Sequence, residues 1–205
     1  METLVMVFLK FPEPGKVKTR LGAEVGNEES ARIYRELVRC VLGRIPEGQR
    51  VRVVFDPVDR EVEVRVWLDG LLEKVGEVDF RAQVGGDLGE RMEAAFVEAF
   101  ADGAERVVVV GTDCVDLGQA EYGDAWRLLA SGHDVVFGVA RDGGYYLLGL
   151  GRPVAGLFRG IPWSSERTLA ASFDAASHAG LVVGLLRPLS DVDTLADWES
   201  VKGRL

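Results

Sequence analysis

A cluster of basic side chains follows the first apolar run of the sequence. Residues 10–20 hold four cations and one acidic residue, Glu13, so they carry +3 in a chain whose formal net charge is −9. Four cations can neutralise a polyanion of about two charges, such as a diphosphate, and Gly15 lets the backbone approach such a ligand closely. The competing interpretation is a solvated basic turn without a ligand. The four cations are Lys10, Lys16, Lys18 and Arg20.

A carboxylate follows the apolar run 107–110. The order Gly-Thr-Asp over residues 111–113 puts Asp113 at the end of a predicted buried strand. Carboxylate oxygens at such a position can bind Mg²⁺ or Mn²⁺ and so connect the ion to phosphates. We therefore expect Asp113 to be a metal ligand and Thr112 to contact the nucleotide or its diphosphate. Asp116 either joins this site or begins the next helix.

A literal Asp-x-Asp motif, Asp191-Val192-Asp193, lies near the C-terminal end of the chain. In an extended segment its two carboxylates share one face and can complete a metal site from the other end of the sequence. If a helix begins here, Asp193 or Thr194 is only a cap. We expect Asp193 to be the second metal ligand and leave the role of Asp191 open, functional or structural.

Asp142-Gly143-Gly144 follows another apolar run. The paired glycines permit a tight turn and a close approach of the backbone, so Asp142 can serve as catalytic base toward an acceptor, with Gly143 and Gly144 beside the acceptor or sugar. A plain hairpin turn is the competing interpretation, and it is the favoured one for this segment taken alone.

Two weaker features complete the set of candidate residues. Gly86 lies just before a predicted helix, where amide groups favour an anion, although a structural turn explains it equally well. Trp163 and Ser164 can offer an aromatic face and a hydroxyl to a sugar, although Trp163 can equally be packing.

The elements that must position these residues alternate along the chain, as apolar runs of strand length and segments of helical periodicity. Predicted strands cover residues 3–9, 50–55, 80–84, 106–110, 134–139, 145–150 and 181–186. Predicted helices cover residues 61–72, 88–100 and 120–130. Three more are predicted: one capped by Asn27, one starting near Ser164 or Ser165, and a terminal one in which Thr194 and Asp197 have the capping-box spacing.

This alternation predicts an α/β fold, a three-layer α/β/α sandwich around a mostly parallel sheet. The length of 205 residues fits a single domain over residues 1–205. In open α/β sheets, ligands bind beyond the carboxyl ends of the strands. We therefore expect the loops named above to meet at that edge.

Composition and missing motifs exclude several function classes. The chain lacks the GxGxxG, GxxxxGK[ST] and GxSxG motifs, and its two histidines, His133 and His178, lie far from the strand ends. The net charge of −9 argues against nucleic acid and anionic lipid as partners. Two cysteines without CxxC spacing favour a reducing compartment, and no apolar run is long enough for a signal peptide or a membrane span. We expect a cytoplasmic protein.

Taken together, the segments resemble a bacterial family of arsenosugar-biosynthesis-type glycosyltransferases, formerly of unknown function. Residues 8–21 match its pattern F-x-K-x-P-x-P-G-x-V-K-T-R-L, and residues 83–92 match Q-x-G-x-D-L-G-E-R-M. Related forms of G-T-D-C-P-x-L, G-P-A-x-D-G-G-Y, P-W-S and D-V-D-T follow in the same order. The chain departs from the pattern at Val115, Val139 and Leu195, where proline is usual; these positions flank the candidate residues without replacing them.

This resemblance implies the nucleotide-diphospho-sugar transferase fold, which is Rossmann-like and is shared by GT-A glycosyltransferases and nucleotidyltransferases. It implies phosphate contacts for three cations of the basic segment, metal contacts for Asp113 and Asp193, and a place near the acceptor for Asp142. The three cations are Lys10, Lys18 and Arg20.

The sequence thus predicts a transferase that depends on Mg²⁺ or Mn²⁺ and moves a sugar from a nucleotide-sugar donor to a small acceptor. A second hypothesis is a pyrophosphate-releasing nucleotidyltransferase, because several motifs also resemble 2-phospholactate guanylyltransferase. Two hypotheses without catalysis are a nucleotide-binding module and a phosphate-binding protein whose aspartates are turns and caps. The donor base, the sugar, the acceptor and the oligomeric state stay open.

Overall fold

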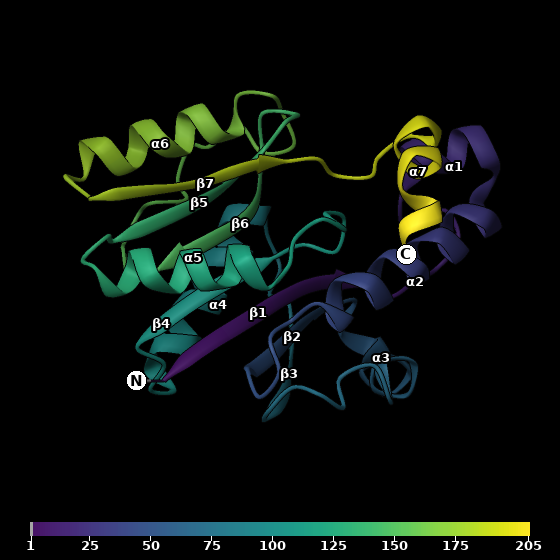
Figure 1. The fold of residues 1–205 in the computed structure, drawn as a ribbon, viewed down its shortest axis with the longest axis horizontal. Helices are drawn as coiled ribbons and strands as arrows, with labels where there is room; N and C mark the ends of the chain where they lie inside the picture. Colours follow the sequence, from purple (N-terminus) through teal and green to yellow (C-terminus); the bar gives the residue numbers. More distant parts are fainter. Residues whose placement is uncertain (1) are drawn as a thin grey trace.

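The computed structural model describes residues 2–205, and seven strands in this part of the chain form one sheet (Figure 1). Their order across the sheet is β3-β2-β1-β4-β6-β5-β7. Six strands run parallel, and β6 is antiparallel to both of its neighbours. The strands are β1 (Thr3–Lys10), β2 (Arg50–Asp56), β3 (Val78–Ala82), β4 (Arg106–Val110), β5 (Val135–Ala140), β6 (Tyr145–Leu150) and β7 (Val183–Leu189).

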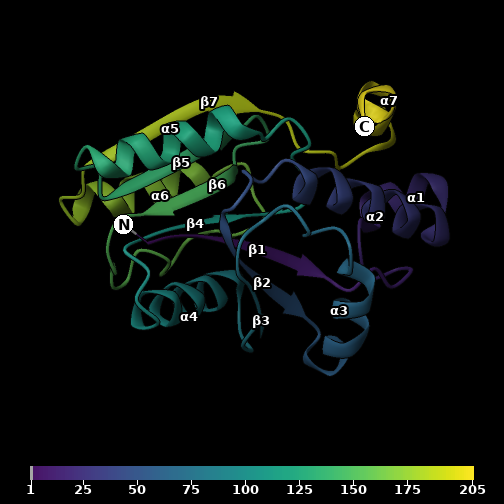
Figure 2. The same ribbon diagram turned by 60° about the horizontal axis from the view of Figure 1, so that its bottom comes forward.

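Helices cover both faces of this sheet. The cores place α2, α3 and α5 on one face and α4 and α6 on the other, and Figure 2 shows α5 and α4 on opposite sides of the strands. The predicted three-layer sandwich is therefore confirmed. The helices are α1 (Thr19–Val25), α2 (Asn27–Gly43), α3 (Glu61–Leu68), α4 (Leu88–Ala101), α5 (Gln119–Ala130), α6 (Thr168–His178) and α7 (Leu195–Val201), with short 3₁₀ turns at Val58–Arg60 and Lys202–Arg204.

The central strand β1 shows why the strands are apolar without interruption. Val5 and Val7 pack into the core beneath α2 and α5, whereas Leu4 and Met6 pack into the core beneath α4. Successive side chains of a strand point to opposite faces, so a strand covered on both faces needs apolar residues at every position. The same requirement explains the run of four valines in β4.

A third apolar cluster lies beyond the sheet and joins α1, α2 and α7. Trp198 of α7 packs there with Leu21 of α1 and Leu37 of α2. Figure 1 shows α7 and α1 side by side, away from the sheet and connected to β7 by an extended segment. The expected capping box of Thr194 and Asp197 is present and begins α7. The segment between β7 and α7 carries the Asp-x-Asp motif and crosses the edge of the sheet.

Most of the predicted elements are present, but the bounds of β3, β7 and α3 differ by about two to four residues, and three further details also differ. Residues 19–25 form α1, where the sequence predicts a loop. Gly26, not Asn27, is the N-cap of α2. The helix expected near Ser164 or Ser165 starts only at Thr168, because Ser164 has a left-handed backbone (φ 57°), which a helix does not accommodate.

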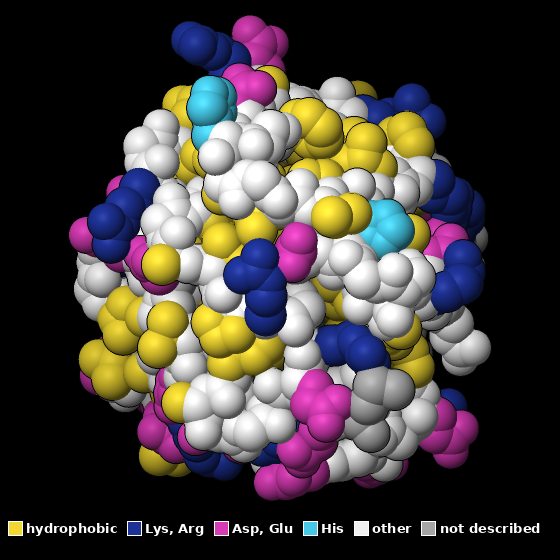
Figure 3. Space-filling model, turned by 90° about the vertical axis from the view of Figure 1, so that its left-hand side faces the viewer, with side chains coloured by type: hydrophobic (Ala, Val, Ile, Leu, Met, Phe, Trp, Pro, Cys, Tyr) yellow, Lys and Arg dark blue, Asp and Glu magenta, His cyan; other side chains and the backbone are white. Residues whose placement is uncertain are grey.

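The opposite edge of the sheet, at the amino ends of the parallel strands, carries no concentration of one charge. Figure 3 views this side and shows acidic and basic side chains interspersed, with histidine exposed at two places. In residues 2–205 no helix combines the length and the apolar character that a membrane crossing requires.

Candidate functional site

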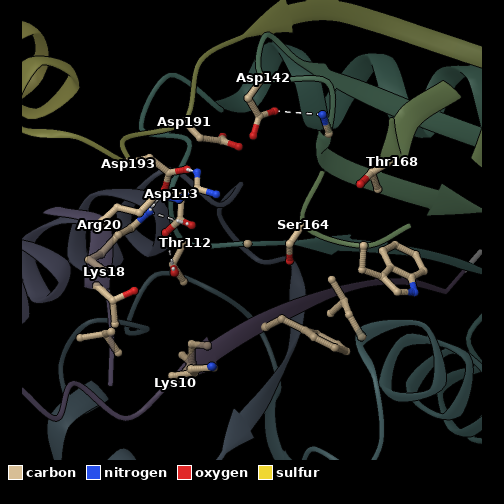
Figure 4. Close-up of a pocket in the computed structure, with 18 of the residues that line it drawn as sticks. Lys10, Lys18, Arg20, Thr112, Asp113, Asp142, Ser164, Thr168, Asp191 and Asp193 are labelled. Carbon is tan, nitrogen blue, oxygen red and sulfur yellow. Dashed lines mark hydrogen bonds and ion pairs between the residues drawn. The ribbon is translucent and has the colours of Figure 1, made fainter. Parts of the chain in front are cut away.

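A pocket of about 940 Å³ opens at the carboxyl edge of the sheet, where the sequence predicted a ligand site. Its wall contains eleven of the thirteen candidate residues, and Figure 4 shows the labelled members of this set. They come from the end of β1 and the segment that follows it into α1, from the loops after β3, β4, β5 and β7, and from the segment before α6. The eleven are Lys10, Lys18, Arg20, Gly86, Thr112, Asp113, Asp142, Gly144, Trp163, Ser164 and Asp193.

The centre of the pocket wall is an ion-pair cluster around Lys18. Its Nζ lies 2.9 Å from Oδ2 of Asp113 and 2.8 Å from Oδ1 of Asp193, and the side chain is only 6% exposed. Burial by itself lowers the pKa of Lys18, but the charges of Asp113 and Asp193 more than offset this and hold the pKa above its usual value. Lys18 therefore bridges the two expected metal ligands as a charged ammonium.

The backbone of Lys18 is strained. In residues 2–205 two non-glycine residues have left-handed backbone angles, Lys18 (φ 46°) and Ser164 (φ 57°), and both line this pocket. Such a conformation costs an L-residue about 1–2 kcal/mol. The two ion pairs at the tip of the Lys18 side chain help to offset this cost, together with the N–H of Gly22, which donates to the carbonyl oxygen of Lys18 at 2.8 Å.

Asp113 is held at both carboxylate oxygens. Oδ2 contacts Lys18, and Oδ1 accepts the hydroxyl of Thr112 at 3.4 Å. The Thr112 hydroxyl lies 3.3 Å from Oη of Tyr34, which also accepts the main-chain N–H of Lys10 at 3.0 Å. Burial raises the pKa of Tyr34 to about 12, so the phenol is neutral. Tyr34 thus connects the ends of β1 and β4.

Sequence reasoning missed Tyr34, because a tyrosine on the apolar face of α2 looks like ordinary core packing. It left Asp191 open, and the structure places this residue in the pocket wall as well. Oδ1 of Asp191 is buried without a hydrogen-bond partner among residues 2–205. Burial, together with the charges of Asp113 and Asp142, raises the pKa of Asp191 to about 7. The Asp-x-Asp spacing was the available signal.

Asp142 lies in a turn and also lines the pocket, and its role as catalytic base stays a prediction. β5 and β6 form an antiparallel hairpin, and Oδ1 of Asp142 accepts the N–H of Gly144 at 2.9 Å, so the segment is a turn. Asp142 and Gly144 also line the pocket. Gly143 does not: a Cβ there would lie 2.2 Å from the carbonyl oxygen of Glu166, so this glycine (φ 91°) permits close packing of two loops.

Trp163 lines the pocket as part of a cluster of aromatic rings. It packs edge-on against Tyr145 with ring centroids 6.5 Å apart, and against Phe158 at the same distance. Its Nε1 is buried without a hydrogen-bond partner among residues 2–205. The exposed Ser164 lies beside it, so an aromatic face and a hydroxyl are available to a ligand.

Gly86 lines the pocket, and a capping box lies directly after it, at the start of the next helix; that this helix start binds an anion stays a prediction. The side chain of Asp87 accepts the N–H of Glu90, and the side chain of Glu90 accepts the N–H of Asp87. This capping box already satisfies amide groups at the start of α4. A Cβ at Gly86 would lie 2.1 Å from Oε2 of Glu90, so the glycine makes room for the cap.

The remaining candidates have other surroundings. Gly15 lies outside the pocket wall, against the side chain of Asn27. Asp116 neither joins the site nor begins a helix; it pairs with Arg204 at 2.7 Å. Lys10 has no ion pair within residues 2–205. The side chain of Arg20 is 73% exposed, and its guanidinium forms a long ion pair of 3.5 Å with Oδ2 of Asp193.

The donor set of the pocket fits a divalent cation that shares its coordination with a ligand. Within residues 2–205 no three carboxylate, histidine or cysteine side chains converge closely enough to hold a metal. Mg²⁺, however, is usually held by one or two carboxylates together with water and substrate phosphates. Asp113 and Asp193 already face a common cation, and the unpartnered Oδ1 of Asp191 adds a further oxygen nearby.

Comparisons with known proteins identify the family and the fold of this chain. Residues 46–165 match the family described as uncharacterized proteins conserved in bacteria, DUF2064. A presumed nucleotide-diphospho-sugar transferase from Desulfovibrio desulfuricans G20 is 36% identical over the whole chain and 87% of its own, with a TM-score of 0.86. No curated protein matches the chain.

Two more distant structures share the fold. A cytidylyltransferase from Leptospira borgpetersenii has a TM-score of 0.58 and 16% identity over 98% of this chain and 85% of its own. Glucosyl-3-phosphoglycerate synthase from Mycobacterium tuberculosis, in complex with Mn²⁺, UDP and glucosyl-3-phosphoglycerate, has a TM-score of 0.55. Its identity is 13% over 99% of this chain and 76% of its own. The fold is therefore that of nucleotide-diphospho-sugar transferases and cytidylyltransferases.

Proposed function

This chain belongs to the bacterial DUF2064 family, and on that premise we propose that it is a metal-dependent transferase that uses a nucleotide-activated donor. The reaction we favour is transfer of a sugar from a nucleotide sugar to a small acceptor. One observation carries the proposal: the two carboxylates that face a common cation, Asp113 and Asp193, share one pocket with the free ammonium of Lys10 and with Asp142.

The 36% identical protein from Desulfovibrio supports the donor class, because it is described as a presumed nucleotide-diphospho-sugar transferase. The arsenosugar-biosynthesis motifs support glycosyl transfer in particular. Asp113 and Asp193 would hold Mg²⁺ or Mn²⁺, which when bound supplies positive charge against the phosphates of the donor. The Mn²⁺ in the Mycobacterium synthase complex is a precedent for such a metal on this fold.

The cations of the first loop would stabilise the leaving nucleoside diphosphate. Lys10 and Arg20 line the pocket and are exposed, so their charges are available to phosphate oxygens. These charges would act where negative charge develops on the leaving group.

Asp142 would accept the proton of the acceptor hydroxyl. One of its oxygens is fixed by the N–H of Gly144, which orients the carboxylate and leaves the other oxygen for the acceptor. Trp163 and Ser164 line the same pocket and would contact the acceptor or the donor sugar.

The second candidate is nucleotidyl transfer, in which the same cations would stabilise an α-phosphoryl transition state and pyrophosphate would leave. The likeness of the basic loop and of the Asp-Gly-Gly and Asp-x-Asp-Thr segments to 2-phospholactate guanylyltransferase supports it. The two reactions differ in their products. Sugar transfer releases nucleoside diphosphate, and nucleotidyl transfer releases pyrophosphate.

A thermal-shift panel tests the donor site first. Nucleoside diphosphates, triphosphates and nucleotide sugars are each measured with Mg²⁺, with Mn²⁺ and with a chelator. A ligand at about a hundred times its Kd stabilises the folded state by about 2.7 kcal/mol, which raises Tm by roughly 5–10 °C for a chain of this size. The best donor is then incubated with candidate acceptors and the released product is identified. A flat panel under all metal conditions would refute the donor site.

A further inference from the structure

Lys18 differs from the other cations of the first loop in its surroundings. Its ammonium is buried between Asp113 and Asp193, whereas Lys10 and Lys16 are exposed and have no ion pair within residues 2–205. Figure 4 shows Lys18 on the side of the pocket that holds the aspartates, and Lys10 apart from them. The basic segment that was expected to bind phosphate therefore contains two kinds of cation, a buried and paired Lys18 and the exposed Lys10 and Lys16.

The carboxylates around Lys18 carry more negative charge than its ammonium neutralises. Asp113 and Asp193 contact it directly, and Asp142 and Asp191 line the same pocket wall, whereas Arg20, 3.5 Å from Asp193, adds one further positive charge. A divalent cation would compensate this group better than one ammonium. The ammonium, however, already lies between the two carboxylates that such an ion needs, so the two cations compete for one position.

We propose that Lys18 is an internal counter-ion that competes with the divalent metal for Asp113 and Asp193 and, once displaced, binds the phosphates of the donor. This inference rests on the proposed function, because it assumes a metal and a phosphorylated donor in this pocket. The strained backbone of Lys18 supports it. When the ammonium leaves, the two ion pairs no longer help to offset the strain, which favours a change of conformation at this residue.

Two affinities that should change in opposite directions test the exchange. Lys18→Met removes the charge and keeps the length of the side chain, and Lys16→Met, at an exposed lysine of the same loop, is the matched control. Free Mn²⁺ is measured by electron paramagnetic resonance without nucleotide. We expect Lys18→Met to bind Mn²⁺ about tenfold or more tightly than wild type, because its two carboxylates lose their counter-ion.

The second constant is measured at saturating Mn²⁺ with UDP, GDP, CDP and ADP. We expect Lys18→Met to bind the preferred diphosphate about tenfold more weakly than wild type, because it lacks the released ammonium. Lys16→Met should leave the Mn²⁺ affinity within about twofold, since Lys16 is exposed and does not contact the carboxylates. Circular dichroism and Tm establish that each variant is folded.

The wild-type protein provides a test that does not depend on the variant. With ¹⁵N-labelled lysine, we expect the ammonium resonance of Lys18 to shift when Mg²⁺ is added, while that of Lys16 stays in place. An unchanged Lys18 signal at Mg²⁺ saturation, or unchanged or weaker Mn²⁺ binding by Lys18→Met, would overturn the exchange and leave the proposed function standing. Absence of Mn²⁺ binding in wild type and variant, with and without each nucleotide, would overturn both.

Discussion

The main-chain N–H of Val192 donates a hydrogen bond to the carbonyl oxygen of Asp113 at 3.0 Å. This bond fastens the segment between β7 and α7 to the end of β4. It brings the carboxylates of Asp191 and Asp193 beside that of Asp113, although the two segments are far apart in the sequence. Lys18 then crosses the junction with a hydrogen bond to a residue 175 positions away, Asp193. The candidate site is thus assembled at the place where the C-terminal segment meets the sheet.

Asp113→Asn should abolish the metal-dependent part of nucleotide binding. The amide retains a hydrogen-bonding oxygen for Thr112 but lacks the charge that a divalent cation needs. We expect turnover to fall about 10²–10³-fold, as is typical when one electrostatic stabiliser is removed. The control is Asp116→Asn, which is outside the pocket and pairs with Arg204. Equal metal dependence in wild type and Asp113→Asn would contradict the assignment.

Asp142→Asn should separate catalysis from donor binding. Asparagine can still accept the N–H of Gly144, so the turn is preserved while the proton acceptor is lost. We expect kcat to fall about 10²–10⁴-fold with little change in the Kd of the donor. Steady-state kinetics and donor titration measure the two quantities. If donor binding is lost together with kcat, Asp142 belongs to the donor site.

Tyr34→Phe should destabilise the fold, because it removes the acceptor of the Lys10 N–H. An unpaired main-chain donor of this kind costs about 1–3 kcal/mol, which urea unfolding can measure. Tyr122→Phe is a matched control, since the hydroxyl of Tyr122 is buried without a partner among residues 2–205. That second change should leave the free energy of unfolding equal or higher. Equal losses in both variants would rule out a connecting role for Tyr34.

Asp134 should make stability depend on pH in the acid range. The N–H of Val182 and the guanidinium of Arg152 hold the pKa of Asp134 below its usual value. A lowered pKa stabilises the folded state above the unfolded pKa of about 4, and this contribution is lost as pH falls through the folded value.

We therefore expect Asp134→Asn to be less stable than wild type at pH 7, with the difference shrinking below about pH 4. Urea unfolding over this pH range measures it. Asp174→Asn, at an exposed aspartate of α6 that has no ion pair within residues 2–205, is the control. A difference that stays constant with pH would mean that the charge of Asp134 does not contribute.

Gly143→Ala should be strongly destabilising. The new methyl group would lie 2.2 Å from the carbonyl oxygen of Glu166, and the left-handed backbone (φ 91°) disfavours any side chain. We expect a loss of about 2 kcal/mol or more. Gly43→Ala, at the exposed end of α2 with no atom within 4 Å of the new carbon, should be neutral or slightly stabilising. Normal stability of Gly143→Ala would mean that the two loops are free to separate.

The sequence by itself determined the elements and the edge at which the ligand site forms. β4 and β6 have the predicted bounds, and the capping box of Thr194 and Asp197 is present. These features depend on side-chain periodicity and on residues three or four positions apart, which a local pattern contains. The sequence also predicted that the loops after the strands lie at one edge of the sheet, because the carboxyl ends of parallel strands meet there.

Only the tertiary structure decided what each charged residue contacts. Lys18, Lys10 and Lys16 have the same chemistry in the sequence, yet Lys18 alone of the three is buried between two aspartates. The sequence left the roles of Asp116 and Asp191 equally open. In the structure Asp116 pairs with Arg204, whereas Asp191 lines the pocket. The physical reason is that these ion pairs and this burial depend on how α7 docks against α1 and α2. That contact joins the last helix to the first two helices of the chain.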